Sequence, residues 1–262
     1  MLKVRIVPTL LWKGLGLVKG QSFDSSRRVG PVLPAVKVYN NRDVDELVLV
    51  DIDAYQTGEG PDVESVSDFA DECFVPFTVG GGITQVDQIA RLLRAGADKV
   101  CINTAAYEVP GLVRQAALRF GAQCVVASID ARRMPDGSWR CFGRSGTHDI
   151  GKDPVSWAKE LQDEGAGEIL MTSIDRDGTL SGYDLELIAA VVQAVNLPVI
   201  ASGGAGNYEH MRQAVQDAGA AAVAAASMFH FTEQTPAQAK LFLAAAGVPV
   251  RSSFNASVAT RT

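Results

Sequence analysis

The chain has 262 residues, of which 24 are basic and 30 acidic, so its formal net charge is −6. Hydrophobic residues make up 47% and charged residues 21%, proportions that exclude a disordered or collagen-like chain. The negative charge argues against a broad nucleic-acid-binding face, because phosphate backbones are bound through clustered Lys and Arg.

Short β-branched runs alternate with amphipathic stretches along the chain. Eight strands are predicted, at residues 4–10, 46–51, 75–79, 99–103, 124–129, 168–172, 198–201 and 221–226. Amphipathic patterns predict helices between them, including 87–95, 154–164 and 185–195. This length permits two small domains or one large α/β domain, but no Pro/Gly/Ser-rich linker divides the chain. We therefore expect a single closed (β/α)8 barrel over residues 1–251, with a loose polar tail over 252–262.

The sequence contains an internal repeat. Residues 78–82 (TVGGG) match 201–205 (ASGGA), and 95–97 match 218–220, both at an offset of 123. Residues 50–53 match 172–175 at an offset of 122. One nearly constant spacing predicts that the barrel consists of two homologous halves with four strand–helix units each.

Glycine-rich turns follow predicted strands in both halves. In a (β/α)8 barrel the functional groups lie in these turns, where glycine lets backbone N–H groups approach a phosphate. The first half offers Gly81, Gly82, Asn103 and Thr104, and the second half offers Asp177, Gly178, Gly204, Ala226 and Ser227. The glycines alone would be compatible with tight turns, but two repeat-related sets favour binding. They predict an elongated ligand with a phosphate at each end.

Two further residues are candidates for chemistry at the mouth of the barrel. Residues 13–20 (KGLGLVKG) are predicted to form a mobile loop in which Lys19 is the cation that binds an anion or a carbonyl group of the ligand. Asp130 ends the fifth strand on the same face as Ser128, where its carboxyl group would act as a general acid or base. The repeat aligns Asp130 with Leu11, so one member of a possible carboxylate pair is missing. Asp51, Asp175 and Asp177 also lie near strand ends, but the repeat places none of them opposite Asp130.

Four of the predicted strands carry a charged residue at or near their start, namely Arg5, Glu46, Lys99 and Glu168. Barrel interiors are normally apolar. If the four side chains face inward, they form a neutral ring at the barrel floor that gates a small neutral molecule. The alternative is that they simply extend from the strand ends into water.

No cofactor, metal or membrane segment is expected. Cys73, Cys101, Cys124 and Cys141 have no metal-ligand spacing and do not cluster with histidines, which favours free thiols in a reducing cytosol. No secretory signal and no apolar run of about 18 residues is recognisable, so a cytoplasmic protein is predicted.

Six stretches resemble the HisF family, the cyclase subunits of imidazole glycerol phosphate synthase: 77–83 (FTVGGGI), 94–106 (RAGADKVCINTAA), 128–132 (SIDAR), 165–184 (GAGEILMTSIDRDGTLSGYD), 200–206 (IASGGAG) and 226–231 (ASMFHF). The resemblance covers essentially residues 1–251. It implies a barrel paired with a HisH-type glutaminase, whose ammonia crosses the barrel and reacts with a bisphosphorylated ribulosyl aminoimidazole carboxamide nucleotide. The implied products are imidazole glycerol phosphate and an aminoimidazole carboxamide ribotide, in histidine biosynthesis.

The resemblance also implies roles for individual residues. Asp130 matches a catalytic aspartate, and Asp98 matches a residue at the glutaminase interface. Ligand-binding positions are matched by Lys19, Gly82, Asn103, Thr104, Asp177, Gly178, Gly204, Ala226 and Ser227. The ring at the ammonia entrance is matched by Arg5, Glu46, Lys99 and Glu168.

One departure from the family pattern is prominent. The usual Cys-Leu-Asp-Val stretch reads Thr9-Leu10-Leu11-Trp12, so a leucine replaces the second catalytic aspartate. The chain looks more like a branch found with surface-polysaccharide genes, which shares the leucine-rich first strand. That branch implies a subunit that conducts ammonia to a sugar amidotransferase. A histidine-pathway cyclase is the alternative, and a ProFAR-isomerase-like barrel acting alone is disfavoured by Leu11 and the charged floor.

Overall fold

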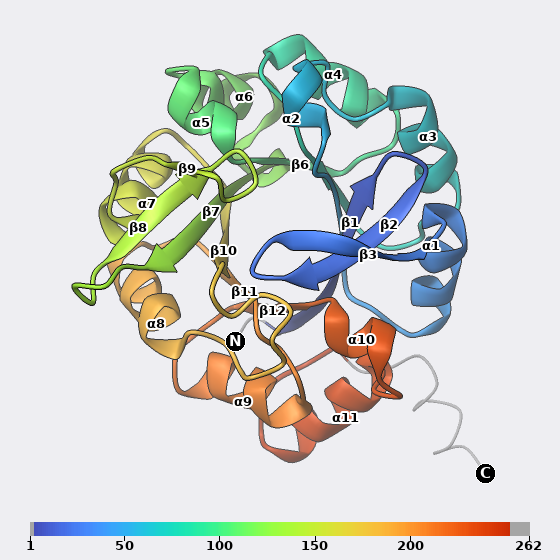
Figure 1. Cartoon of the computed structure of the whole chain (residues 1–262). Helices are drawn as coiled ribbons and strands as arrows, with labels where there is room; N and C mark the ends of the chain where they lie inside the picture. Colours follow the sequence, from blue (N-terminus) through green and yellow to red (C-terminus); the bar gives the residue numbers. More distant parts are fainter. Residues whose placement is uncertain (1–2, 252–262) are drawn as a thin grey trace.

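Eight parallel strands close into a barrel in the computed structural model, which describes residues 3–251 (Figure 1). The strands in order around the barrel are β1 (Arg5–Lys13), β4 (Leu47–Asp51), β5 (Phe77–Gly80), β6 (Lys99–Ile102), β7 (Val125–Arg133), β10 (Glu168–Ser173), β11 (Val199–Ser202) and β12 (Ala222–Ala225). Parallel pairing of β1 with β12, from Arg5↔Ala222 to Pro8↔Ala225, closes the ring. The predicted (β/α)8 barrel is confirmed.

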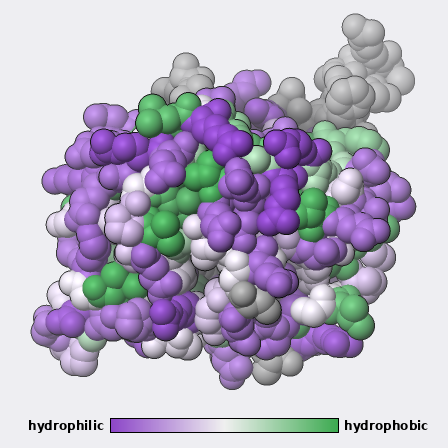
Figure 2. Space-filling view, turned by 90° about the horizontal axis from the view of Figure 1, so that it is seen from above, coloured by the Kyte–Doolittle hydropathy of each residue, from purple (hydrophilic) through white to green (hydrophobic). Residues whose placement is uncertain are grey.

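Helices surround the barrel and bury its outer face. They are α1 (Val32–Asn41), α2 (Ala54–Thr57), α3 (Val63–Asp71), α4 (Val86–Arg94), α5 (Thr104–Glu108), α6 (Leu112–Phe120), α7 (Pro154–Asp163), α8 (Leu185–Ala194), α9 (Tyr208–Gln216), α10 (Ser227–Phe231) and α11 (Pro236–Ala245), with a 3-10 turn at Ala122–Cys124. The predicted helices correspond to α4, α7 and α8 within one residue at each end. Asp153 caps α7 by accepting a bond from the Ser156 N–H, and Pro154 opens the first turn. The face of the molecule seen in Figure 2 is mainly hydrophilic, with hydrophobic residues in small patches.

Apart from the larger core cluster, a separate apolar cluster fills the inside of the barrel. It consists of buried side chains from seven barrel strands: Val7, Val48, Cys101, Val126, Leu170, Ile200, Ala222 and Ala224. Parallel strands buried on both faces read as continuous apolar runs, which is why the sequence pattern located them. This cluster separates the floor of the barrel from its mouth.

The first and fifth barrel strands continue beyond the rim as antiparallel extensions. β1 pairs with β2 (Gly16–Gln21), which pairs with β3 (Asp24–Gly30), and the β2–β3 hairpin crosses the mouth in Figure 1. β7 pairs in the same way with β8 (Trp139–Gly143), which pairs with β9 (His148–Asp149). The two extensions are therefore equivalent parts of the two half-barrels.

The prediction of a loop at residues 13–20 was wrong, because β1 runs to Lys13 and β2 follows at once. The strands turn at Gly14, whose φ of +54° lies in the left-handed region that glycine adopts without strain. Leu11 then pairs with Val18, and Trp12 with Leu17. Three glycines and two lysines made this segment resemble a loop, whereas β2 is mostly buried because it lies over the mouth.

The two ends of the described chain meet at the barrel floor. The Val4 N–H donates to the Pro249 carbonyl at 2.7 Å, and Val4 forms a parallel bridge with Val250. The predicted tail, residues 252–262, lies outside the described residues. Within residues 3–251 no helix is both long enough and apolar enough to cross a bilayer.

Candidate functional site

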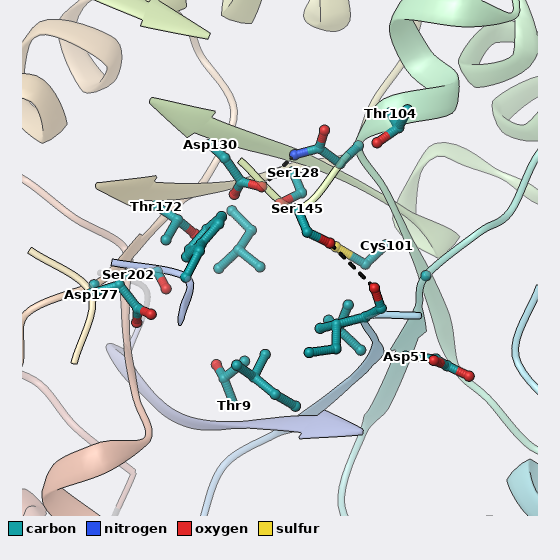
Figure 3. A pocket seen from close by; sticks show the side chains of 18 of the residues that line it. Thr9, Asp51, Cys101, Thr104, Ser128, Asp130, Ser145, Thr172, Asp177 and Ser202 are labelled. Atoms are coloured by element: carbon teal, nitrogen blue, oxygen red, sulfur yellow. Dashed lines mark hydrogen bonds between the residues drawn. The ribbon is translucent and has the colours of Figure 1, made fainter. Parts of the chain in front are cut away.

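A cavity of about 450 Å³ opens at the mouth of the barrel, where the carboxyl ends of the strands meet. Figure 3 shows its side chains converging from both half-barrels, with Thr104 and Asp177 on opposite sides. Every predicted ligand-binding residue lines it, together with Asp130: Lys19, Gly81, Gly82, Asn103, Thr104, Asp177, Gly178, Gly204, Ala226 and Ser227. The structure thus brings together residues that lie up to 208 positions apart in the sequence.

Asp130 points into this cavity from β7, at the point where the strand leaves the barrel and begins to pair with β8 (Figure 3). Its Oδ2 accepts a 2.8 Å hydrogen bond from the Asn103 side-chain amide. Burial and the negative charge of Asp177 raise the pKa of Asp130 to about 7, although hydrogen bonds from Thr172 and Ser128 oppose the shift. A carboxyl group with this pKa both gives and takes protons near neutral pH, as general acid–base chemistry requires.

Lys19 and Asp177 are charged residues on the side of the cavity where the second-half cradle lies. Lys19 lies on β2 with only 4% of its surface exposed, and this burial lowers its pKa to about 8 against the opposing effect of Asp177. Burial likewise raises the pKa of Asp177, while the charge of Lys19 works in the other direction. The hairpin is held here because the Ser22 N–H donates to the Asp177 carbonyl at 2.8 Å. Lys19 is therefore fixed over the cavity by strand pairing.

Leu11 and Thr9 line the wall contributed by β1, and Leu11 brings no carboxylate to it. The repeat relationship between Leu11 and Asp130 is thus also spatial, because each lies at the upper part of a rim strand that continues into a hairpin. Two polar atoms of the wall, Thr9 Oγ1 and Asn103 Oδ1, are buried without a hydrogen-bond partner among the described residues. Buried polar atoms are normally paired, so both are free to bind a polar ligand.

The glycines of the cradles have a steric reason of their own. Gly82 has a φ of +58°, and a Cβ there would overlap with the carbonyl of Ala54, the first residue of α2. Gly204 has a φ of +103°, and a Cβ there would overlap with the carbonyl of Gly182. Close packing between adjacent loops therefore requires glycine whether or not a phosphate binds. The ligand-binding prediction rests on the partners that converge with these glycines.

The four charged residues meet at the barrel floor as a closed ring. Arg5 donates to Glu46 Oε2 at 2.7 Å and to Glu168 Oε1. Lys99 Nζ lies 2.9 Å from Glu46 Oε1 and 3.0 Å from Glu168 Oε2. Each carboxylate thus bridges both cations, which satisfies two anions that are almost fully buried. The four side chains therefore face inward as a ring and do not extend from the strand ends into water. The role of this ring as a gate stays a prediction.

Asp98 lies beside this ring at the start of β6, with its side chain exposed. Its Oδ2 accepts a 2.8 Å bond from the Phe77 N–H, which fixes the carboxylate at the floor. The position is compatible with contact to a partner below the barrel, and this role also stays a prediction.

The cysteines do not form a metal centre. All four are free thiols, and Cys101 and Cys141 are buried. Burial raises the pKa of Cys101 to about 12, so its thiol is not a ready nucleophile. Within residues 3–251, no group of three or more His, Cys, Asp and Glu side chains is arranged to hold a metal ion.

Comparison with known proteins agrees with this geometry. A family model described as "Histidine biosynthesis protein" matches residues 5–235. Proteins named "Imidazole glycerol phosphate synthase subunit HisF" are 49% identical to the chain in Caulobacter vibrioides, over 96% of the chain and 97% of the relative. The protein of that name in Hyphomonas neptunium is also 49% identical, over 96% of the chain and 99% of the relative. The chain belongs to the HisF family.

Several residues of this HisF-family site were not predicted from the sequence. Ser145 and Arg144 reach the cavity from the turn between β8 and β9, and Ser145 Oγ donates to the Ile52 carbonyl at 3.2 Å. Thr172 lies on β10, directly in register with Asp130 on β7. The two-residue periodicity of β10 was a usable signal for Thr172. No comparable signal marked Arg144, because the β7–β8–β9 extension was not recognised.

Gly82→Ala is expected to lower the free energy of unfolding by about 2–4 kcal/mol, because the new methyl group collides with a rigid backbone carbonyl. Gly58→Ala is the matched control, since Gly58 has a similar φ of +70° but open space around it. The control is expected to lose only about 1 kcal/mol. Urea denaturation of both variants measures the difference, and equal losses would contradict the packing explanation.

Asp130→Asn is expected to stabilise the protein at pH 8 and to have little effect near pH 4. The folded protein keeps the Asp130 proton up to about pH 7, whereas an ordinary aspartate releases it near pH 3.8. Stability linked to the protonated form is therefore present below pH 4 and is lost as the pH rises through 7. The melting temperature of the variant should exceed that of the wild type by about 5–10 °C at pH 8.

The control for this measurement is Asp163→Asn, on the exposed end of α7. Its melting temperature should follow that of the wild type across the pH range. A gap for Asp130→Asn that stays constant from pH 4 to pH 8 would show that the Asp130 carboxyl group is not perturbed.

Proposed function

We propose that the chain is the ammonia-receiving cyclase subunit of an imidazole glycerol phosphate synthase-type complex. In this function a HisH-type glutaminase docks at the floor, and ammonia moves through the barrel to a bisphosphorylated aminoimidazole carboxamide nucleotide at the mouth. The observation that carries the proposal is the alignment of three features on one axis: the charged floor ring, the apolar interior and Asp130 above it. The names of the 49% identical relatives support the same reaction.

The route between floor and mouth is short. Cys101, Leu170 and Ala224 belong to the interior cluster and also line the cavity, so the cavity reaches down into the barrel. Arg5, which belongs to the floor ring, is in register with Ala222, and Ala222 belongs to the interior cluster. The ring and the apolar interior are therefore adjacent. An apolar layer of this kind admits neutral ammonia more readily than ammonium, because an unpaired charge loses its hydration there. The ring above the partner would have to open for each molecule, since its four ion pairs close the floor.

At the mouth, Asp130 is the group suited to proton transfer during addition of ammonia and closure of the imidazole ring. Asn103 orients its carboxyl group, and its raised pKa keeps both protonation states available. Lys19 supplies positive charge beside Asp177 at the second-half cradle, and the two cradles hold one phosphate each. The nearby Asp177 is a second carboxylate in the same cavity, and its charge reaches both Asp130 and Lys19.

A second candidate function follows from Leu11. A leucine cannot transfer a proton or balance a developing positive charge, so β1 places no second carboxylate opposite Asp130. This observation favours a HisF-type subunit that conducts ammonia to a sugar amidotransferase in surface-polysaccharide synthesis. In that function the barrel and its glutaminase would be retained, while the cyclase reaction would not.

An ammonium-dependent cyclase assay with the bisphosphorylated nucleotide separates the two functions. The cyclase proposal expects turnover by the wild-type chain and a loss on the order of 100-fold or more in Asp130→Asn. Leu11→Asp, which restores a second carboxylate, is the matched comparison. Turnover absent in the wild type but present in Leu11→Asp would overturn the cyclase proposal in favour of the conduit.

Binding of a HisH-type glutaminase tests the partner in both cases. The purified chain is expected to form a one-to-one complex by size-exclusion chromatography and calorimetry. Asp98→Asn, which keeps an acceptor oxygen for the Phe77 N–H, should weaken the complex by about 5- to 10-fold if the charge lies in the interface. Asp136→Asn, at the β7–β8 turn on the mouth side, is the control. Equal affinities of both variants and the wild type would place the interface elsewhere.

A further inference from the structure

The two rim hairpins each bring one cation to the mouth. Among the described residues that line the cavity, Lys19 and Arg144 are the two with cationic side chains. Lys19 comes from the extension of the first barrel strand and Arg144 from the extension of the fifth, which are equivalent positions in the two half-barrels. Lys19 is on the side of Asp177, in the second-half cradle. Arg144 is on the side of Thr104, in the first-half cradle.

Arg144 is bonded directly to that cradle. Its backbone N–H donates to Thr104 Oγ1 at 2.9 Å, which leaves the hydroxyl proton of Thr104 available for an acceptor in the cavity. This geometry requires a φ of +51° at Arg144, a left-handed conformation that non-glycine residues adopt at a cost. The turn therefore fixes the arginine next to Thr104 at the expense of backbone strain.

The guanidinium group of Arg144 has a replaceable partner. Its Nε and Nη2 lie 2.9 and 2.8 Å from Glu108 Oε1, at the end of α5. Both side chains are well exposed, at 51% and 39%, and pairs of this kind are weak in water. A phosphate offers the same planar fork two charge-assisted hydrogen bonds, which are stronger than a screened surface pair. Glu108 also lines the cavity, so the exchange needs only a side-chain rotation.

We propose that Arg144 binds the ligand phosphate in the first-half cradle, as the counterpart of Lys19, and that Glu108 competes with this phosphate for the guanidinium group. Arg144 is then a specificity-determining residue, because a ligand must carry an anion at this end to release it from Glu108. The inference rests on the bisphosphorylated ligand of the proposed function, but it does not depend on which reaction that ligand undergoes.

The opposite effects expected of two substitutions test this inference. Inorganic phosphate is titrated into the full chain, and amide NMR signals of Gly82 and Thr104 report the first cradle while those of Gly204 and Ser227 report the second. Arg144→Gln should weaken phosphate binding at the first cradle on the order of 10-fold and leave the second within about 2-fold. Glu108→Gln should strengthen binding at the first cradle by about 2- to 5-fold, because it removes the competitor.

Controls keep the result interpretable. Arg140→Gln removes another arginine of the same extension, one that pairs with Asp149 outside the cavity, and should leave both affinities unchanged. Melting temperatures show whether each variant is folded. The phosphate affinity of Arg144→Lys, which keeps the charge, should fall between those of the wild type and Arg144→Gln.

If Glu108→Gln weakens binding as Arg144→Gln does, the pair only holds the turn in place and the inference is wrong. Unchanged binding in Arg144→Gln, or no phosphate at the first cradle of the wild type, also overturns it. Since phosphate is not turned over, a negative cyclase assay leaves this test unaffected.

Discussion

The hydrogen bonds between β1 and β12 close the barrel, and the arrangement of the site depends on this closure. Without it, Arg5 on β1 would not meet Glu168 on β10, so the ring at the floor would stay open. The closure also directs all eight carboxyl ends to one rim, where loops from both halves surround a single cavity. Because β1 and β7 are longer than their neighbours, their extensions rise above this rim on two sides. One covalent chain thereby provides a pseudo-symmetric mouth with one cation on each hairpin.

Electrostatics distinguishes the floor from the mouth. At the floor, two cations and two carboxylates neutralise one another through direct ion pairs. At the mouth, Asp130, Asp177 and Lys19 are separated and partly desolvated, so their pKa values move toward neutrality. Such perturbed groups are typical of catalytic and binding sites. Leu11 adds no charge to this arrangement, so Asp177 and Lys19 are the charged neighbours of Asp130 in the cavity.

Sequence patterns located most of the barrel because buried parallel strands and amphipathic helices have distinct periodicities. The repeat and the glycine-rich turns also identified the residues of the cavity, since strand ends in a closed barrel must converge. The extensions β2–β3 and β8–β9 were missed for a physical reason. Their pairing is antiparallel and depends on turn residues such as Gly14, Ser22 and Arg144 in left-handed conformations, which carry little sequence signal. The steric need for glycine at Gly82 and Gly204 was equally invisible, because it arises from loops distant in sequence.

In the proposed function, each half-barrel holds one phosphate of an elongated ligand above an ammonia passage. A crystal structure of the chain with the bisphosphorylated aminoimidazole carboxamide nucleotide would show where both phosphates bind. We expect one phosphate against Gly82 and Thr104 and the other against Gly204 and Ser227, with the reacting carbon between them and within reach of Asp130. A ligand with both phosphates in one half, or bound outside the mouth, would rule out this arrangement.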